Sequence, residues 1–186
     1  EKTLRKVVQF APSVASRTQT QATMALVISM IGMVAYLWIR FGTMQYGLAA
    51  IVALMHDVAI VLGLYTLAGF FGLGNFKIDM ALVAAVLTII GYSVNDTIVV
   101  FDRIRENRGK LTTLTGPMID LAVNQTMSRT LLTGATTIVS LIVMLIWGGS
   151  GVQGFALAFL IGVITGTYSS FAIAATLLMH PRVLKG

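Results

Sequence analysis

The chain has 186 residues, of which 56% are hydrophobic and only 11% are charged, and its mean hydropathy is +0.87. Soluble domains are about 45–50% apolar and about 25% charged, so this composition excludes an ordinary soluble protein and indicates one whose solvent is largely lipid. The net charge of +6 does not indicate a nucleic-acid partner, because most of the 13 basic residues lie at the ends of apolar runs, as topology-determining charges do.

The chain opens with a tail, residues 1–19, that carries four basic residues. They are Lys2, Arg5, Lys6 and Arg17. The tail has neither an initiator Met nor a signal peptide, so we expect the chain to be a segment of a longer protein.

Five apolar runs follow the tail, each long enough for a helix across a hydrocarbon core of about 30 Å, which takes about 20 residues. None shows the strict alternation of a barrel strand, so the sequence predicts an all-α, polytopic membrane helix bundle. We place the spans at residues 20–41, 47–71, 78–101, 129–147 and 152–179.

The one long connection, residues 103–128, is basic at its start. It holds Arg103, Arg105, Arg108 and Lys110. Cytoplasmic loops carry an excess of Lys and Arg, so we expect this connection to be cytoplasmic. An odd number of spans then places the N-terminal tail outside and the C-terminal tail, residues 181–186, inside. The basic residues of the N-terminal tail oppose this topology unless the tail belongs to a folded external domain, whose translocation ignores its charge.

The same connection contains the start of a helix. Thr115 or Gly116 is a cap candidate, and Pro117 occupies a first-turn position, where its missing N–H does no harm. We predict a short cytoplasmic or interfacial helix that leads into the fourth span.

The charged residues around the end of the third span suit a solvated helix terminus. Asp102 and Arg105 are spaced i,i+3, and Glu106 and Lys110 are spaced i,i+4, so each pair is placed to form a helical ion pair. We assign these four residues, together with Arg103, to capping and topology.

Small residues recur where helices could approach closely. Gly162 and Gly166 form a GxxxG motif, and Gly134 lies in a fourth span that is rich in Thr and Ser. Such residues let helix backbones pack tightly in lipid, so we predict a packing role, with a moving contact between helices as the alternative.

Asp96 lies well inside the third span. A carboxylate near the bilayer centre costs about 2.5–3.5 kcal/mol, so such residues usually face a bundle interior and act on ions or protons. Burial disfavours the anion and a nearby cation favours it, and a carboxyl group under both influences can exchange protons reversibly. The alternative is a carboxyl group that only hydrogen-bonds a neighbouring helix.

Four polar residues surround Asp96 on the same helix. Asn95 and Thr97 flank it on other faces, whereas Tyr92 and Ser93 lie one turn earlier, near its own face. We regard all four as supporting residues.

Asp57 lies about ten residues into the second span, beside His56. Adjacent helix residues point about 100° apart, so the two side chains need not touch. Asp57 is a second candidate for the proton path, and His56 could shuttle protons because its side chain titrates near physiological pH. The alternative for both residues is a packing or hydrogen-bonding role.

Arg129 opens the fourth span. If the second, third and fourth spans share an interior, Arg129 could reach towards Asp96 and set its charge state. The alternative is a topology anchor whose charge extends to the membrane surface.

The sequence predicts neither a metal site nor a cofactor. The chain has no cysteine, which excludes disulfides and thiolate metal ligands, and its two histidines, His56 and His180, are far apart in the sequence.

Several motifs are specific as a set. They are GYSVNDTIVVFDRIREN at residues 91–107, HDV at 56–58, SRTLLTG at 128–134, GG at 148–149, GTYSS at 166–170 and YLWIRF at 36–41. Together these motifs resemble the SecF family of bacterial protein-export membrane proteins, over nearly the whole chain.

This resemblance implies a function and partners. SecF pairs with SecD, separately or fused, as a transporter of the resistance-nodulation-division (RND) type in the bacterial inner membrane. The chain would supply the last five spans of a six-helix half, with its tail ending an external domain. The family is thought to use proton flow to help preproteins leave the SecYEG channel. Asp96 and Arg129 would be the proton-path residues, together with an aspartate of SecD, and the protein would not be an enzyme.

Two other functions compete with this one. Asp57 and Asp96 could form the dyad of an intramembrane protease, but the Gly-x-Gly-Asp element expected there is missing, because Asp96 follows Ser93, Val94 and Asn95. A proton-driven RND exporter of lipids or small molecules would also place acidic residues in its middle helices. Only the block at residues 91–107 favours SecF over such an exporter.

Overall fold

The computed structural model describes residues 12–72, 79–111 and 113–179, and none of these lies in a β-strand. Five helices are long and apolar enough to cross a membrane, which confirms the predicted all-α bundle. They are α1 (Pro12–Phe41), α2 (Met44–Phe70), α3 (Met80–Arg108), α4 (Gly116–Trp147) and α5 (Ser150–Ser169), and the last continues into a π-helical turn, η1 (Ser170–Ala174), and the short α6 (Ala175–Leu177). Large apolar side chains such as Ile39, Leu132 and Trp147 are exposed, as expected where the surrounding solvent is lipid.

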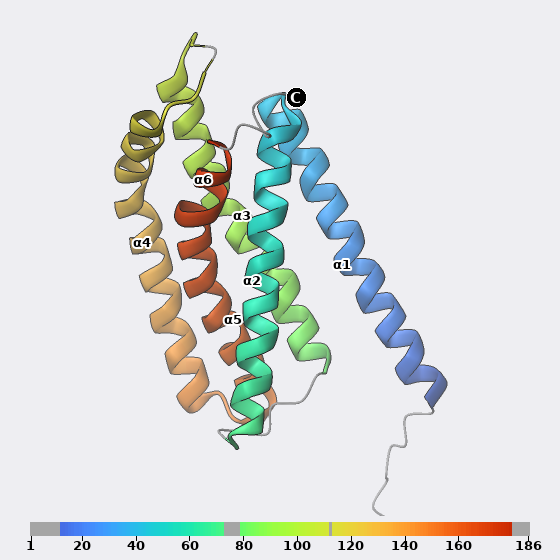
Figure 1. Ribbon diagram of the computed structural model, residues 1–186. Coiled ribbons are helices and arrows are strands. Elements are labelled where there is room, and N and C mark those ends of the chain that lie inside the picture. The colour runs from blue at the N-terminus through green and yellow to red at the C-terminus, as the bar shows by residue number, and fades with distance from the viewer. Residues whose placement is uncertain (1–11, 73–78, 112, 180–186) are drawn as a thin grey trace, which may run out of the picture.

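The helices form a bundle from which α1 diverges. Figure 1 shows α2, α3, α4 and α5 running alongside one another, whereas α1 leans away towards its N-terminal end. α5 packs against α2, α3 and α4, and α1 packs against α2 and less extensively against α3. The C-terminal ends of α1 and α3 and the N-terminal ends of α2 and α4 gather at the upper end of the figure, so this end collects most of the charged residues.

α3 and α5 approach closely through two glycines of α5. A Cβ atom added at Gly162 would come closer than 3.0 Å to three carbons of the Ile89 side chain, and one added at Gly166 would lie 3.1 Å from Cβ of Ser93. Gly134 of α4 is also buried, beside α5. The GxxxG motif therefore lies at the contact between α5 and the helix that carries Asp96.

An aromatic cluster anchors the turn between α1 and α2 to α3. Gly42 makes this turn with φ +71°, a conformation that side-chain-bearing residues rarely adopt. The Phe41 ring then stacks on Tyr46 at 4.8 Å between centroids, and Phe101 meets both rings edge-on at 5.9 and 5.1 Å. This cluster holds the end of α1 against the end of α3, although the two helices diverge elsewhere.

Most of residues 103–128, predicted as a connection that contains a separate short helix, belong to the two long helices on either side. The prediction of a separate short helix is therefore wrong. α3 continues past Phe101 to Arg108, and the residues before Arg129 belong to α4 itself. At 1.5 Å per residue the 32 residues of α4 measure about 48 Å, which exceeds a hydrocarbon core of about 30 Å. Hydropathy located the apolar part of each helix, whereas backbone hydrogen bonding continues into the polar region.

The predicted helix start is confirmed, because Thr115 is an N-cap and Pro117 lies in the first turn, but the helix that begins there is α4 itself and not a separate short helix. The first helix begins at Pro12, within the predicted tail at residues 1–19. Residues 1–11 of that tail, and the predicted C-terminal tail at residues 181–186, lie outside the described residues.

The predicted ion pair between Asp102 and Arg105 is wrong. Asp102 instead pairs with Arg40 of α1, at 2.8 Å between Oδ1 and Nη2. Arg105 donates from Nη1 to the backbone oxygen of Arg40 at 3.1 Å. The turn between α1 and α2 packs against this end of α3 and offers both residues a partner from another helix.

The predicted pair between Glu106 and Lys110 is also wrong. Glu106 pairs with Arg103, one turn earlier, at 2.6 Å between Oε2 and Nη1. α3 ends at Arg108, so Lys110 lies beyond the helix and the i,i+4 geometry does not exist.

We expect Gly162→Ala to destabilise the folded protein by about 1–3 kcal/mol, because the new methyl group would displace Ile89 in a packed interface. Thermal unfolding of the purified full-length protein in detergent measures this loss. Gly63→Ala is the matched control, because a Cβ atom at that exposed helical position meets nothing within 4 Å. Equal unfolding temperatures for the two variants would contradict the role assigned to Gly162.

Candidate functional site

Asp96 of α3 lies in the interior of the bundle. Asp96 is 2% exposed, and the Oδ2 atom of its carboxyl group is buried without a hydrogen-bond partner. An ionised carboxyl group that is buried without a partner is costly, unless it takes up a proton or a cation approaches it. The local structure therefore leaves one oxygen of the Asp96 carboxyl group unsatisfied.

Arg129 of α4 is the cation that acts electrostatically on the Asp96 carboxyl group. Arg129 is exposed, and it lines a polar pocket of about 340 Å³ between α1, α3 and α4. Among the described residues, no ion pair joins Arg129 to Asp96. The charge of Arg129 is thus near enough to act on the Asp96 carboxyl group, although the two side chains form no ion pair.

Ser93 and Thr97 are both nearly fully buried on α3, at 1% and 2% exposure. The Thr97 hydroxyl donates to the backbone oxygen of Ser93, one turn earlier, at 3.0 Å. The Thr97 hydroxyl therefore donates its hydrogen bond within α3, whereas the Ser93 hydroxyl donates to Asp57 on another helix.

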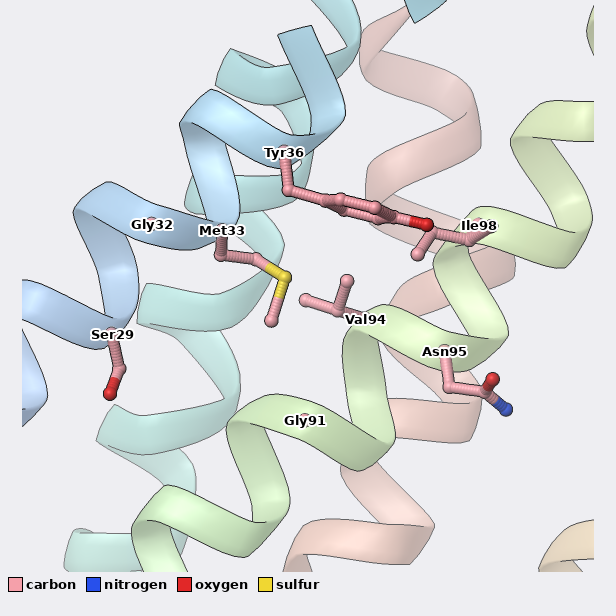
Figure 2. Close-up of a pocket in the computed structure, with 8 residues that line it drawn as sticks. All are labelled: Ser29, Gly32, Met33, Tyr36, Gly91, Val94, Asn95 and Ile98. Carbon is pink, nitrogen blue, oxygen red and sulfur yellow. The ribbon is translucent and has the colours of Figure 1, made fainter. Parts of the chain in front are cut away.

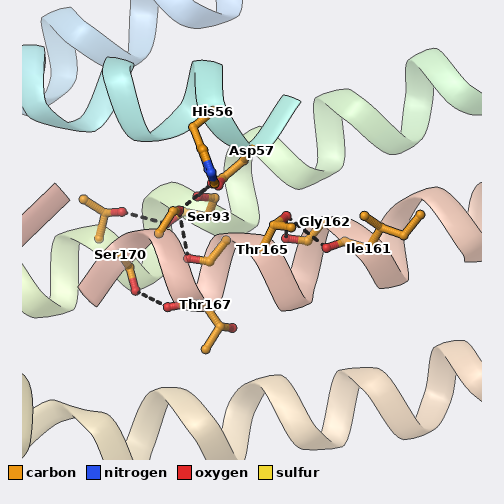
Figure 3. A network of polar contacts seen from close by, with 11 residues as sticks. His56, Asp57, Ser93, Ile161, Gly162, Thr165, Thr167 and Ser170 are labelled. Atoms are coloured by element: carbon orange, nitrogen blue, oxygen red, sulfur yellow. Dashed lines mark hydrogen bonds and ion pairs between the residues drawn. The ribbon is translucent and has the colours of Figure 1, made fainter. Parts of the chain in front are cut away.

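Asp57 of α2 is the centre of a second polar cluster, which Figure 3 shows in close-up. It is fully buried, and its Oδ2 atom accepts hydrogen bonds of 2.7 Å from the hydroxyl groups of Ser93 and Ser169. These bonds join α2 to both α3 and α5. Both donors to Oδ2 are neutral hydroxyls, so this oxygen is satisfied without a charged partner.

The Ser169 hydroxyl lies where α5 changes its winding. Ser169 ends the regular helix, and the π-helical turn begins at Ser170. Single π-helical turns inside α-helices are rare and often occur at functional sites. Here the irregular turn adjoins the residue that binds Asp57, and η1 itself packs against α2 and α3.

His56 does contact Asp57, although their spacing on the helix left this open. The Nδ1 atom of His56 lies 3.2 Å from Oδ1 of Asp57, and the imidazole is about one-third exposed. His56 therefore joins the Asp57 cluster to the outer surface of α2.

The side chains of Tyr92 and Asn95 do not share the surroundings of Asp96. The Tyr92 hydroxyl lies 3.3 Å from the Thr137 hydroxyl of α4. Asn95 is exposed and lines a groove of about 540 Å³ between α1 and α3, together with residues that include Ser29 and Tyr36 (Figure 2). Within the part of the chain that the structure describes, neither side chain bonds to Asp96 or Arg129.

The structure thus separates the predicted site residues into two clusters along α3. One contains Asp96 and Arg129, and the other contains Asp57, His56 and Ser93. No group of three or more potential metal ligands of the His, Cys, Asp or Glu type occurs in the described part of the chain. The Ser169 hydroxyl was not predicted as part of the site. Its signals in the sequence were a Ser-Ser pair inside an apolar run and its position in the GTYSS motif.

The comparisons with known proteins agree on one family. Residues 1–182 match the family described as "Protein export membrane protein SecD/SecF, C-terminal". The chain is 42% identical to the protein translocase subunit SecF of Desulfurispirillum indicum over 92% of its length and 54% of the relative's length. It is 43% identical to SecF of Rhodobacter capsulatus over 90% of its length and 49% of the relative's length. The chain therefore spans about half the length of these relatives.

A solved structure has the same fold. The crystal structure of SecDF from Thermus thermophilus, described as a translocon-associated membrane protein, matches with a TM-score of 0.81 at 39% sequence identity. The match covers 90% of this chain and 22% of that one.

We expect Asp57→Ala to lower stability by about 1–3 kcal/mol, because it leaves two buried serine hydroxyls without their acceptor. Asp57→Asn keeps a side-chain oxygen for both donors and should remain close to the wild type. Thermal unfolding of the full-length protein distinguishes the two variants. Equal stability of Asp57→Ala and wild type would show that the cluster does not hold the three helices together.

Proposed function

We propose, since the chain belongs to the SecD/SecF family of protein-export membrane proteins, that it is the membrane part of a SecF transport subunit that uses proton flow to drive preprotein translocation. The partners in this proposal are SecD, fused or separate, the SecYEG translocon, the preprotein and the surrounding lipids. Protons are the coupling ion and no cofactor takes part. The protein is a transport subunit rather than an enzyme.

The observation that carries the proposal is the state of Asp96. Its carboxyl group is buried, one of its oxygens lacks a partner, and an arginine of the next helix acts on it without being bonded to it. A carboxyl group that only served packing would be satisfied, as Asp57 is. This difference supports Asp96, rather than Asp57, as the group that takes up and releases the proton.

Protonation of Asp96 would change the force between α3 and α4. When the carboxyl group is neutral, Arg129 has no anion to approach, and when it is ionised the guanidinium is attracted to it. At 4 Å and an effective dielectric constant of 20, this attraction amounts to about 4 kcal/mol. That is enough to shift an equilibrium between two helix arrangements roughly a thousandfold.

Asp57 takes a secondary place on the proposed path. Its hydroxyl partner Ser93 lies on α3 one turn before Asp96 and Thr97, so a change at either carboxyl group acts on the same helix. His56 gives this cluster its contact with the outer surface. The supporting role of Tyr92 and Asn95 in this proposal is to contact α4 and to line the groove beside α1.

The proposed location is the bacterial inner membrane. The charged end of the bundle, where α3 ends and α4 begins, is cytoplasmic by the positive-inside rule. The N-terminal tail is then periplasmic and the C-terminus cytoplasmic.

We expect Asp96→Asn to abolish proton-dependent secretion, while the protein still assembles with SecD, because the amide has nearly the same shape but cannot carry a proton. Translocation of a preprotein into inverted membrane vesicles, with and without a proton gradient, measures this. Asp120→Asn, which makes the same change at an exposed aspartate of α4 that lines neither pocket, is the control and should retain activity. Normal gradient-dependent translocation by Asp96→Asn at normal abundance would refute the proposal. If the intact protein instead exported a small hydrophobic compound in an Asp96-dependent way, the exporter function would be favoured.

We expect Arg129→Gln to lose most of this activity and Arg129→Lys to keep part of it, because lysine preserves the charge but not the guanidinium geometry. The same vesicle assay measures both variants, with abundance matched by immunoblotting. If Arg129→Gln is as active as the wild type, a charge on α4 is not needed.

A further inference from the structure

The start of α2 has polar side-chain atoms that are buried without a hydrogen-bond partner. Five such atoms occur in the described part of the chain, and two of them belong to Thr43, the N-cap of α2, and Tyr46, in its first turn. A third is Nε of Arg108, at the end of α3. A buried polar atom without a partner is costly, and a bound ligand or water is a common reason for one.

Arg108 lies beside the start of α2, although it belongs to α3. Arg105, one turn before it, donates from Nη1 to the backbone oxygen of Arg40, at the turn that leads into α2. The Tyr46 ring meets Phe101 of α3 at 5.1 Å between centroids. Arg108 and Arg105 both act electrostatically on the Tyr46 hydroxyl, which belongs to a residue only 2% exposed. The buried hydroxyl group therefore lies near both guanidinium groups.

The charges of these two arginines are not compensated. The Arg108 side chain forms neither an ion pair nor a hydrogen bond with any described residue, and the Arg105 side chain bonds to a backbone oxygen. The two acids near the end of α3, Asp102 and Glu106, are each paired with another arginine. The start of α2 therefore faces two positive charges without a matching acid among the described residues.

The N-terminus of α2 adds to this positive potential. Thr43 makes no side-chain cap hydrogen bond, and the first turn of the helix contains no acidic residue. The first N–H groups of a helix have no partner within it, and together with the helix dipole they attract anions. Backbone donors, hydroxyl groups and guanidinium groups thus meet at one place.

Exposed apolar side chains adjoin this place. Met44 and Leu48, in the first two turns of α2, are each 51% exposed, and Trp38 and Ile39, in the last turn of α1, are 52% and 81% exposed. The apolar surface of the bundle therefore meets its charged end here, at the depth where phospholipid headgroups lie.

We propose that Arg105, Arg108 and the N-terminus of α2 bind the phosphate group of an anionic phospholipid, whose acyl chains lie along Met44 and Leu48. Basic sites between transmembrane helices at the membrane surface suit such headgroups. This inference goes beyond the proposed function, because neither acid of the proposed proton path takes part in the site.

The chemistry of the site matches a phosphate group. A guanidinium group can donate two parallel hydrogen bonds to two phosphate oxygens. The hydroxyl groups of Thr43 and Tyr46 can donate to the others, which would satisfy the unpartnered atoms at the start of α2. A headgroup with net negative charge is preferred, because the cationic choline of phosphatidylcholine would be repelled by the second arginine.

Native mass spectrometry of the purified full-length protein, with added phosphatidylglycerol or phosphatidylcholine of the same acyl chains, measures this binding. We expect Arg108→Gln to weaken the tightest binding of phosphatidylglycerol about tenfold, because a charge-assisted pair is lost. Lys110→Gln, which removes an exposed charge beyond the end of α3, is the control and should leave binding nearly unchanged. Equal losses in the two variants, or equal binding of the two lipids by the wild type, would overturn the site.

Tyr46→Phe provides a readout that a purely structural role would not change. It removes the hydroxyl group and keeps the ring that packs on Phe41 and Phe101. Without lipid, the unfolding temperature should not fall, because the lost hydroxyl had no partner. Phosphatidylglycerol should raise the unfolding temperature of the wild type more than that of Tyr46→Phe. An equal rise in both proteins would overturn the role of Tyr46.

Inorganic phosphate distinguishes a lipid headgroup from a free anion. At millimolar concentration it should leave the unfolding temperature of the wild type unchanged, because a free ion lacks the acyl chains that contribute to binding. If inorganic phosphate stabilised the wild type as much as phosphatidylglycerol does, and Arg108→Gln abolished both effects, the site would bind free phosphate and the assignment to a lipid would be overturned.

Discussion

A carboxyl group placed among membrane helices has to be neutral, hydrogen-bonded or matched by a cation, because lipid offers it no partner. This constraint explains how α2, α3 and α5 pack. Asp57 brings the three helices together, since both hydroxyl groups that satisfy it come from the other two helices. The small side chains of α5 make this possible, because Gly166 lets Ser93 approach the α5 backbone. The packing of the bundle and the satisfaction of its buried acid are therefore the same set of contacts.

The second acid meets the constraint differently. Asp96 is nearly as buried as Asp57, but one of its oxygens has no partner and its cation stays at a distance. A group in this condition contributes little to a single stable arrangement. Two aspartates of similar burial thus have different physical roles because one is surrounded by hydroxyl donors and the other is not.

The charged end of the bundle adds an asymmetry to this arrangement. The aromatic cluster of Phe41, Tyr46 and Phe101 holds α1 against α3 there, and α1 diverges from the bundle beyond it. This contact places Arg40 beside Asp102, with which it forms an ion pair. Of the arginines that line the pocket, Arg129 is then the one without an ion-pair partner among the described residues. The charge that acts on Asp96 is therefore determined partly by a turn that lies far from it in the sequence.

Features that depend on local composition follow from the amino-acid sequence alone. Apolar run lengths identified five helices, because a helix must cross about 30 Å of hydrocarbon, and Thr115 and Pro117 located the start of α4. The rarity of acids in such runs selected Asp57 and Asp96. The ion pairs of Asp102 and Glu106 were mispredicted, because helical spacing considers only partners on the same helix and ignores where the helix ends. Two features could be known only from the folded chain, namely that Ser169 satisfies Asp57 and that Arg129 has no ion-pair partner among the described residues, because each depends on which helix lies opposite and at what distance.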